Sequence, residues 1–185
     1  MIYILSNMID TIKNTCRQLL NQRGYIIEHE TEYLIVGIPS IQTNNYYYHP
    51  TEKICIFLDN ITNDFNVSKS SEYIIKLKQI NINHCIIIYK EKITSVAKKI
   101  SDSINEFTIE LFPVKELMYN ITSHYLVPLH KKLSYESAKD FIKTYDSTIP
   151  VILVKDPVSK FYGFKKKDII EIERNSGYIT YRIVK

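Results

Sequence analysis

The sequence predicts two domains of different class: an α/β domain in residues 1–117 and a smaller α+β domain in residues 118–185. Between residues 53 and 112, apolar stretches with strand character alternate with amphipathic stretches of helical spacing, which is typical of an α/β layer. After Pro113, short helices and strands follow one another in mixed order. The formal net charge of +4 is carried by the second part, because acidic and basic residues nearly balance in the first. The pattern of predicted helices and strands and the distribution of charge therefore both divide the chain near residue 117.

The first domain begins with a stripe of apolar residues at helical spacing from Asn7 to Arg23, which Gly24 closes as a C-cap. Residues 25–38 are expected to be extended. The remaining predicted elements are a strand at Lys53–Asp59, a helix at Ser70–Ile80, a strand at His84–Tyr89, a helix from Thr94 to Ile104 and a strand at Phe107–Phe112. If these strands are parallel, their crossovers are right-handed.

In the second domain, Ser134 is expected to cap a helix whose apolar residues recur at Ala138, Phe141, Ile142 and Tyr145. A short strand follows at residues 151–154. Asp156 and Pro157 then begin a helix of one or two turns, with the aspartate as N-cap and the proline in the first turn, and Gly163 ends it. Strands at residues 168–174 and 178–184 are joined by Asn175-Ser176-Gly177, which favours a hairpin with a bulge.

The three cysteines, Cys16, Cys55 and Cys85, lie far apart in apolar stretches and lack metal-ligand spacing. We expect buried, reduced thiols and a cytosolic or nuclear compartment. No apolar run is as long as a membrane span, and the apolar start of the chain is too short for a signal-peptide core. We therefore expect no membrane association, no metal, no cofactor and no small-molecule substrate.

Two segments are candidates for polar or stacking contacts. His124 and His130 flank Pro128 but have no third ligand nearby, so they are interpreted as polar anchors and not as a metal site. The run Tyr46-Tyr47-Tyr48-His49 could stack on nucleic-acid bases, or it could be an ordinary surface loop.

Two lysine-containing segments are candidates for phosphate contact. Lys165-Lys166-Lys167 could touch phosphate or be a solvated turn. Lys90 and Lys92 stand just before a helix begun by Thr94 and Ser95, where free backbone N–H groups would favour an anion such as a DNA phosphate. The alternative for this second segment is an ordinary capped helix with solvated lysines.

An α/β layer with acidic residues also raises the possibility of a nuclease. Metal-dependent cleavage of this type uses an Asp/Glu-x-Lys triplet on a strand, and no Asp or Glu in this chain has Lys two positions later. Glycine-rich phosphate loops and nucleophile elbows are absent as well. The chain is therefore predicted to be non-catalytic, a binding or structural component whose first domain is a nuclease-like layer without an active site.

Motifs in the second domain resemble the fifth common subunit of eukaryotic RNA polymerases and, over the same region, its archaeal counterpart. The stretch from Asn120 to His130 is similar to the family's N-I-T-x-H-x-L-V-P-x-H. Asp156-Pro157-Val158, with Lys160, Phe161 and Gly163, is similar to D-P-V-x-[RK]-[YF]-x-G. A third match to the family's terminal hairpin comprises Arg174, Ser176, Gly177, Tyr178, Thr180, Tyr181 and Arg182.

The resemblance implies a jaw domain in residues 1–117 and an assembly domain in residues 118–185 of a multisubunit DNA-dependent RNA polymerase. The assembly domain would dock on the largest subunit, and the jaw would face downstream duplex DNA with weak contact. The residues implied for assembly are His124, Pro128, His130, Asp156, Pro157, Gly163, Arg174, Tyr178, Tyr181 and Arg182. Those implied for DNA approach are Lys90, Lys92, Thr94 and Ser95. A free-standing nucleic-acid-binding protein and a nuclease-like enzyme are the rival interpretations.

Three departures from the family pattern affect these expectations. The hairpin connection is short, and Ser95 stands where the family has proline in its jaw. Lys167 stands where the family commonly has glycine, so the turn there is expected to use an ordinary backbone conformation.

The composition, rich in Ile, Asn, Lys and Tyr, suggests a divergent version encoded by a large DNA virus. Its location would be the virion and host cytoplasm if viral, and the nucleus if cellular.

Overall fold

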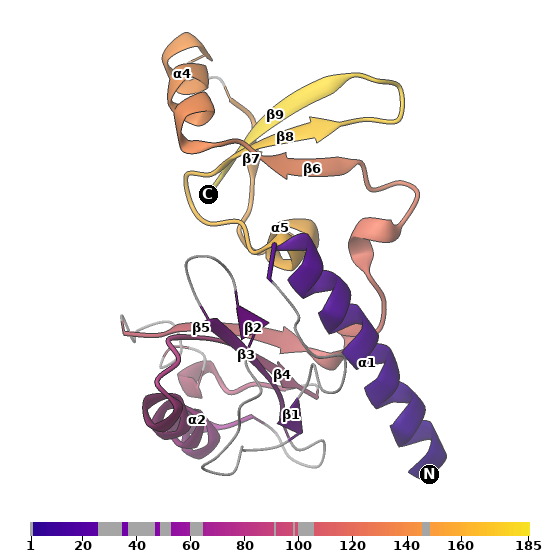
Figure 1. The fold of residues 1–185 in the computed structure, drawn as a ribbon, viewed down its shortest axis with the longest axis vertical. Helices are drawn as coiled ribbons and strands as arrows, with labels where there is room; N and C mark the ends of the chain where they lie inside the picture. Colours follow the sequence, from indigo (N-terminus) through magenta and orange to yellow (C-terminus); the bar gives the residue numbers. More distant parts are fainter. Residues whose placement is uncertain are drawn as a thin grey trace. The chain divides into compact units, whose positions relative to one another are not determined.

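The structure is a computed structural model, and it describes residues 2–25, 35–36, 47–48, 53–59, 65–90, 92–97, 99, 106–145 and 149–185. The chain divides into two compact units, Met1–Tyr119 and Asn120–Lys185. Each unit contains its own sheet (Figure 1). In the part of the chain that is described, no helix has the length and apolar character needed to cross a membrane.

The N-terminal unit is built on a five-stranded sheet in which β3, β4 and β5 are parallel neighbours. One edge of β3 pairs with β1 in parallel and with β2 in antiparallel fashion. The strands are β1 (Ile35–Val36), β2 (Tyr47–Tyr48), β3 (Lys53–Leu58), β4 (His84–Tyr89) and β5 (Thr108–Pro113). The α/β class predicted for this unit is confirmed, and the three main strands, whose order the sequence left open, are parallel neighbours.

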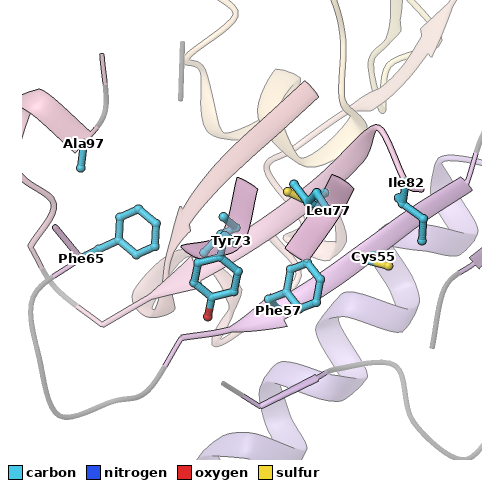
Figure 2. Packing of buried hydrophobic residues seen from close by; sticks show 9 residues of the cluster. Cys55, Phe57, Phe65, Tyr73, Leu77, Ile82 and Ala97 are labelled. Atoms are coloured by element: carbon cyan, nitrogen blue, oxygen red, sulfur yellow. The ribbon is translucent and has the colours of Figure 1, made fainter. Parts of the chain in front are cut away.

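Successive side chains of β3 and β4 point to opposite faces of the sheet, and both faces are apolar. On one face, Cys55 and Phe57 of β3 pack with Tyr73 and Leu77 of α2 (Val67–Ile80), as Figure 2 shows. The opposite face carries the intervening residues of both strands, all buried. The buried stripe of α1 (Ile2–Gln22) comprises Ile12, Cys16, Leu19 and Leu20. Strands buried on both faces explain why their sequences are continuously apolar instead of alternating.

Several predicted boundaries differ from the structure. The helix expected from Asn7 begins at Ile2. The helix expected from Ser70 begins at Val67, because the Asn66 side chain accepts a hydrogen bond from the Lys69 N–H and so caps it three residues earlier. The helix predicted from Thr94 to Ile104 is described only at residues 95–97 and 99, and most of the segment 25–38 lies outside the described residues.

The C-terminal unit contains a four-stranded sheet in the order β6-β8-β9-β7. Its elements are η2 (Ile121–Ser123), β6 (Leu129–Lys132), α4 (Tyr135–Tyr145), β7 (Val151–Ile152), α5 (Pro157–Tyr162), β8 (Ile169–Glu173) and β9 (Ile179–Val184). The sheet is antiparallel except between β7 and β9. Its core consists of Ile152, Phe164, Ile170, Ile172 and Val184. A further short helix, η1 (Val114–Leu117), ends the N-terminal unit.

The local turn signals of this unit are confirmed. Asp156 Oδ1 accepts a hydrogen bond of 2.9 Å from the Val158 N–H, and Gly163 ends α5 with a left-handed φ of 69°. In the hairpin between β8 and β9, the Gly177 N–H donates to the Arg174 carbonyl at 2.7 Å. Gly177 has a φ of 77°, which glycine adopts without steric cost.

Lys167 contradicts the expectation of an ordinary backbone. Its φ is 76°, in the left-handed region that side chains with a Cβ rarely adopt. The turn is fixed from both sides, since the Lys167 N–H donates to the Val184 carbonyl at 2.9 Å and the Asp168 N–H donates to the Lys165 carbonyl at 3.0 Å. These hydrogen bonds impose the glycine-like conformation on lysine.

Candidate assembly and nucleic-acid surfaces

One end of the C-terminal sheet carries large apolar side chains in solvent. Leu129 on β6 and Ile179 on β9 both lie in register with Glu173 of β8, so their side chains share one face. The Asn175 side chain donates to the Tyr125 carbonyl at 3.4 Å, which brings the segment before β6 to the hairpin. We call the following residues the apolar surface: Tyr125, Leu126, Leu129, Tyr178 and Ile179, which are 47 to 76% exposed. Apolar clusters left in solvent mark protein interaction sites.

One residue of this surface, Tyr178, was identified from sequence among the assembly candidates. The other four were missed because a single apolar side chain in solvent is common, and the cluster becomes visible only when strand register is known. The signal that was available is Leu129, which is apolar at a position of β6 directly before the buried His130. A half-buried strand normally carries a polar residue there.

Other predicted assembly residues act inside the C-terminal unit. Asp156 caps α5 and Pro157 is its first residue. His130 is buried, and its Nδ1 donates to the Pro128 carbonyl at 2.8 Å. Burial lowers the pKa of His130 and the Pro128 carbonyl opposes that shift, so the net direction is downward. These groups position the strands, and Gly163 ends α5.

The remaining predicted assembly residues lie nearer the surface. The exposed His124 ring stacks on Tyr125, with centroids 4.9 Å apart. The hydroxyl of Tyr181 donates to Glu171 at 3.0 Å. Arg182 Nη1 lies 3.4 Å from the Val151 carbonyl on β7. Arg174 closes the hairpin, because its N–H donates to the Tyr178 carbonyl at 3.0 Å.

In the N-terminal unit, two helix starts lie side by side. Phe65 and Ile93 form a parallel bridge, which is extended by a hydrogen bond of 3.1 Å from the Thr94 N–H to the Phe65 carbonyl. Asn66 caps α2, and Thr94 Oγ1 accepts a bond of 3.2 Å from the Ala97 N–H. Both segments therefore turn into helix at the same place. The predicted DNA-approach residues Lys90, Lys92, Thr94 and Ser95 are all exposed around the second start.

The Thr94 cap and the helix of α2 were predicted from sequence, whereas the proximity of the two helix starts was missed. Free N–H groups at a helix start favour an anion, and two adjacent starts add their fields. Lys69 in the first turn of α2 does not add a free charge, because its Nζ lies 2.6 Å from Asp59 Oδ2. The positive groups here are therefore the backbone N–H groups, Lys90 and Lys92.

Asp59 occupies the position where an α/β enzyme would hold a catalytic carboxylate, directly after β3. The carboxylate is buried and is engaged by Lys69 on one oxygen and by the Tyr73 hydroxyl, at 3.2 Å, on the other. Burial, followed by the charge of Asp59, raises the pKa of Tyr73, which therefore stays a hydrogen-bond donor. Within the described ranges, no group of three His, Cys, Asp or Glu side chains is arranged to hold a metal ion.

A second charged cluster joins the end of α1 to the sheet. Both oxygens of Glu110 on β5 accept from the Arg23 guanidinium at 2.8 Å, and His84 Nε2 lies 2.7 Å from Glu110 Oε1. The Tyr25 hydroxyl lies 3.2 Å from the other ring nitrogen of His84. Burial alone would raise the pKa of Glu110, but Arg23 and His84 outweigh it and hold that pKa well below its usual range.

Comparisons with known proteins agree with the motifs of the C-terminal unit. Residues 119–184 match the family model described as RNA polymerase Rpb5, C-terminal domain. The chain is 32% identical to the DNA-directed RNA polymerases I, II, and III subunit rpabc1 of Dictyostelium discoideum, over 96% of this chain and 97% of that protein. It is 28% identical to the DNA-directed RNA polymerase subunit 5-like protein 1 of Arabidopsis thaliana, over 92% of each. A Caenorhabditis elegans subunit RPABC1 is 35% identical over 59% of this chain and 56% of its own length.

Proposed function

The chain belongs to the Rpb5 family of RNA polymerase subunits, and from this premise we propose that its C-terminal unit docks on the largest subunit while its N-terminal unit faces downstream DNA. Members of this family are non-catalytic subunits of a multisubunit polymerase. Docking and DNA approach are the two specific roles that we add. The docking proposal rests on the apolar surface.

The apolar surface has the properties of a docking site. Its five side chains combine two tyrosines with three aliphatic residues, and aromatic residues are enriched at protein interfaces. Leu129 and Ile179 project from paired strands, so they lose little conformational freedom on binding. Covering them against a larger subunit removes the cost of leaving these side chains in water.

The proposed DNA approach rests on the paired helix starts. The exposed lysines and hydroxyl groups around Thr94 and Ser95 suit phosphate oxygens, and they offer no set of side chains that reads base edges. Contact there is therefore weak and independent of DNA sequence. Ser95 replaces the family's proline, so it brings a hydroxyl and a backbone N–H that proline lacks.

We also propose that the location of the protein follows the polymerase that it serves. A cellular polymerase places it in the nucleus. The composition, rich in Ile, Asn, Lys and Tyr, favours a viral polymerase, with the protein in the virion and the host cytoplasm.

Docking is tested by affinity capture of the tagged full chain from cells that contain its polymerase. The double variant Leu129→Asp/Ile179→Asp should lose the largest subunit, whereas the control Ile75→Asp, which changes an equally exposed aliphatic residue of α2, should retain it. Circular dichroism of each purified variant checks that the fold is intact. Equal recovery with the double variant would refute docking through this surface.

DNA approach is tested on the isolated chain and on the assembled polymerase. The isolated chain should bind duplex DNA weakly, and Lys90→Ala/Lys92→Ala should reduce the salt dependence of downstream-DNA binding by the assembled enzyme. Submicromolar, steeply salt-dependent binding by the chain alone would favour a free-standing nucleic-acid-binding protein. Cleavage of DNA in the presence of Mg²⁺ would favour a nuclease.

A further inference from the structure

The end of the C-terminal sheet opposite the apolar surface gathers lysines from separate segments of the chain. The Lys167 N–H donates to the Val184 carbonyl, and the Val154 N–H donates to the Lys185 carbonyl, both at 2.9 Å. These bonds place the turn after α5, the end of β9 and the segment after β7 together (Figure 1). We call the following exposed residues the basic cluster: Lys132, Lys155, Lys165, Lys166, Lys167 and Lys185.

The acidic residues beside the basic cluster are already engaged. Asp168 pairs with Lys132 Nζ at 2.9 Å and accepts from the Lys165 N–H at 2.8 Å. Asp156 is engaged as the cap of α5. Among the described residues, no salt bridge is found to Lys155, Lys185 or the three consecutive lysines of the turn. The cluster therefore keeps a local excess of positive charge, which attracts an acidic partner.

Lys167 gives an independent reason to assign the cluster a function. Its left-handed φ of 76° is strained for lysine, and backbone strain of this kind concentrates at functional positions. The hydrogen bonds on either side of Lys167 require the conformation but not the side chain. A lysine is thus held at the centre of the cluster at a conformational cost that glycine would avoid.

Beside the lysines, the sheet has an open edge with apolar side chains. Strand β7 pairs with β9 on one side, and no strand of the described part of the chain pairs with its other side. The Pro150 and Ile152 carbonyls accept hydrogen bonds from β9, so the N–H groups of Val151 and Leu153 are directed away from it. The carbonyls of these two residues already have partners, since the Arg182 guanidinium lies 3.4 Å from the Val151 carbonyl and the Asp156 N–H donates to the Leu153 carbonyl at 3.0 Å. The side chains of Val151 and Leu153 are 39% and 61% exposed.

We propose that the basic cluster and the β7 edge together bind an extended acidic segment of another protein. The segment would accept hydrogen bonds from the Val151 and Leu153 N–H groups of this edge, place aliphatic residues against their side chains, and present carboxylates to the lysines. A protein segment fits better than nucleic acid because phosphate contacts use neither a strand edge nor exposed aliphatic side chains. The six lysines lack the planar fork that recognises phosphate bidentately, and the Arg182 guanidinium beside β7 is engaged by the Val151 carbonyl at 3.4 Å.

The test is fluorescence anisotropy of the full chain with a fluorescein-labelled peptide that alternates glutamate and valine. A glutamate–serine peptide of equal charge and a single-stranded DNA of equal charge are the comparison probes. The glutamate–valine peptide should bind at least about tenfold more tightly than either, and binding should weaken as salt rises. The variant Lys155→Glu/Lys166→Glu should bind it at least about tenfold more weakly.

Two controls separate this site from general attraction and from docking on the largest subunit. Lys139→Glu/Lys143→Glu makes the same charge change on α4 and should alter the affinity by less than about twofold. Leu129→Asp/Ile179→Asp changes the apolar surface and should leave peptide binding unchanged. The peptide-binding proposal can therefore hold even if docking through the apolar surface is refuted. DNA that binds as tightly as the glutamate–valine peptide, equal affinity for the two peptides, or an equal loss in the α4 control would each overturn the proposal.

Discussion

Replacing Lys167 by glycine should stabilise the C-terminal unit even though it removes a side chain. An L-residue in the left-handed region costs about 1–2 kcal/mol. Lys167 has a φ of 76°, so glycine at this position avoids that cost. Glycine also gives the unfolded chain more freedom, which takes back about 0.4–1 kcal/mol. The difference leaves an expected gain of roughly 0–1.6 kcal/mol in the free energy of unfolding, with about 0.8 kcal/mol as the central value.

The assay is urea denaturation followed by circular dichroism, with the denaturant slope compared between variants. Lys167→Ala keeps the strained backbone and loses the same charge, so Lys167→Gly and Lys167→Ala differ in the strain and in the freedom that glycine gives the unfolded chain. Gly177→Ala makes the opposite change, because it introduces a Cβ at a left-handed position and should lower the free energy of unfolding. A Cβ there meets no heavy atom within 4 Å, and only the φ of 77° opposes it, so we expect a loss of roughly 0–1.6 kcal/mol, with about 0.8 kcal/mol as the central value.

The decisive comparison is between glycine and alanine at position 167. If Lys167→Gly is no more stable than Lys167→Ala, the strain of the left-handed conformation does not exceed the roughly 0.4–1 kcal/mol that glycine loses through the unfolded chain. The conformational cost of lysine at this position would then be too small to support our inference. Lys166→Gly serves as the matched control, since Lys166 has no positive φ and glycine there should destabilise by about 0.4–1 kcal/mol.

Three further predictions concern buried and capping groups. Burial raises the pKa of Cys16 and Cys55 to about 12, so a thiol reagent such as Ellman's should react with neither until the protein is unfolded. Glu110→Gln leaves the buried Arg23 without its carboxylate and should cost about 3–5 kcal/mol in urea unfolding. Because folding lowers the pKa of Glu110, its contribution is present above the ordinary carboxyl pKa and is lost as pH falls through the lower, folded value, which acid titration of stability would show. Asp156→Ala should cost about 1 kcal/mol by removing the cap of α5, and Asp156→Asn should restore most of it.

Features of the fold that depend on neighbours in sequence were predictable. The Asp156-Pro157 start and Gly163 end of α5 depend on residues a few positions apart, and both are confirmed. The buried strands β3 and β4 were recognised from their continuous apolar character. The turn at Lys167 was predicted wrongly because the bond that fixes its conformation comes from Val184, on another strand.

Features that depend on distant pairing were not predictable. The parallel bridge between Phe65 and Ile93 brings two helix starts together, and nothing near either residue signals the other. The same holds for the apolar surface, since register places Leu129 and Ile179 on one face. Most predicted assembly residues have roles inside the unit, and their part in docking stays a prediction.

The Arg23–Glu110 pair has a consequence for synthesis of the chain, because its members lie 87 residues apart. A ribosome adds about 5–20 residues per second, so Arg23 is made roughly 4–17 seconds before its carboxylate exists. During that time the apolar stripe of α1, which is buried in the folded unit, belongs to a unit whose sheet still lacks β5. The nascent N-terminal helix is therefore a natural client for a chaperone that shields apolar surface until β5 is complete.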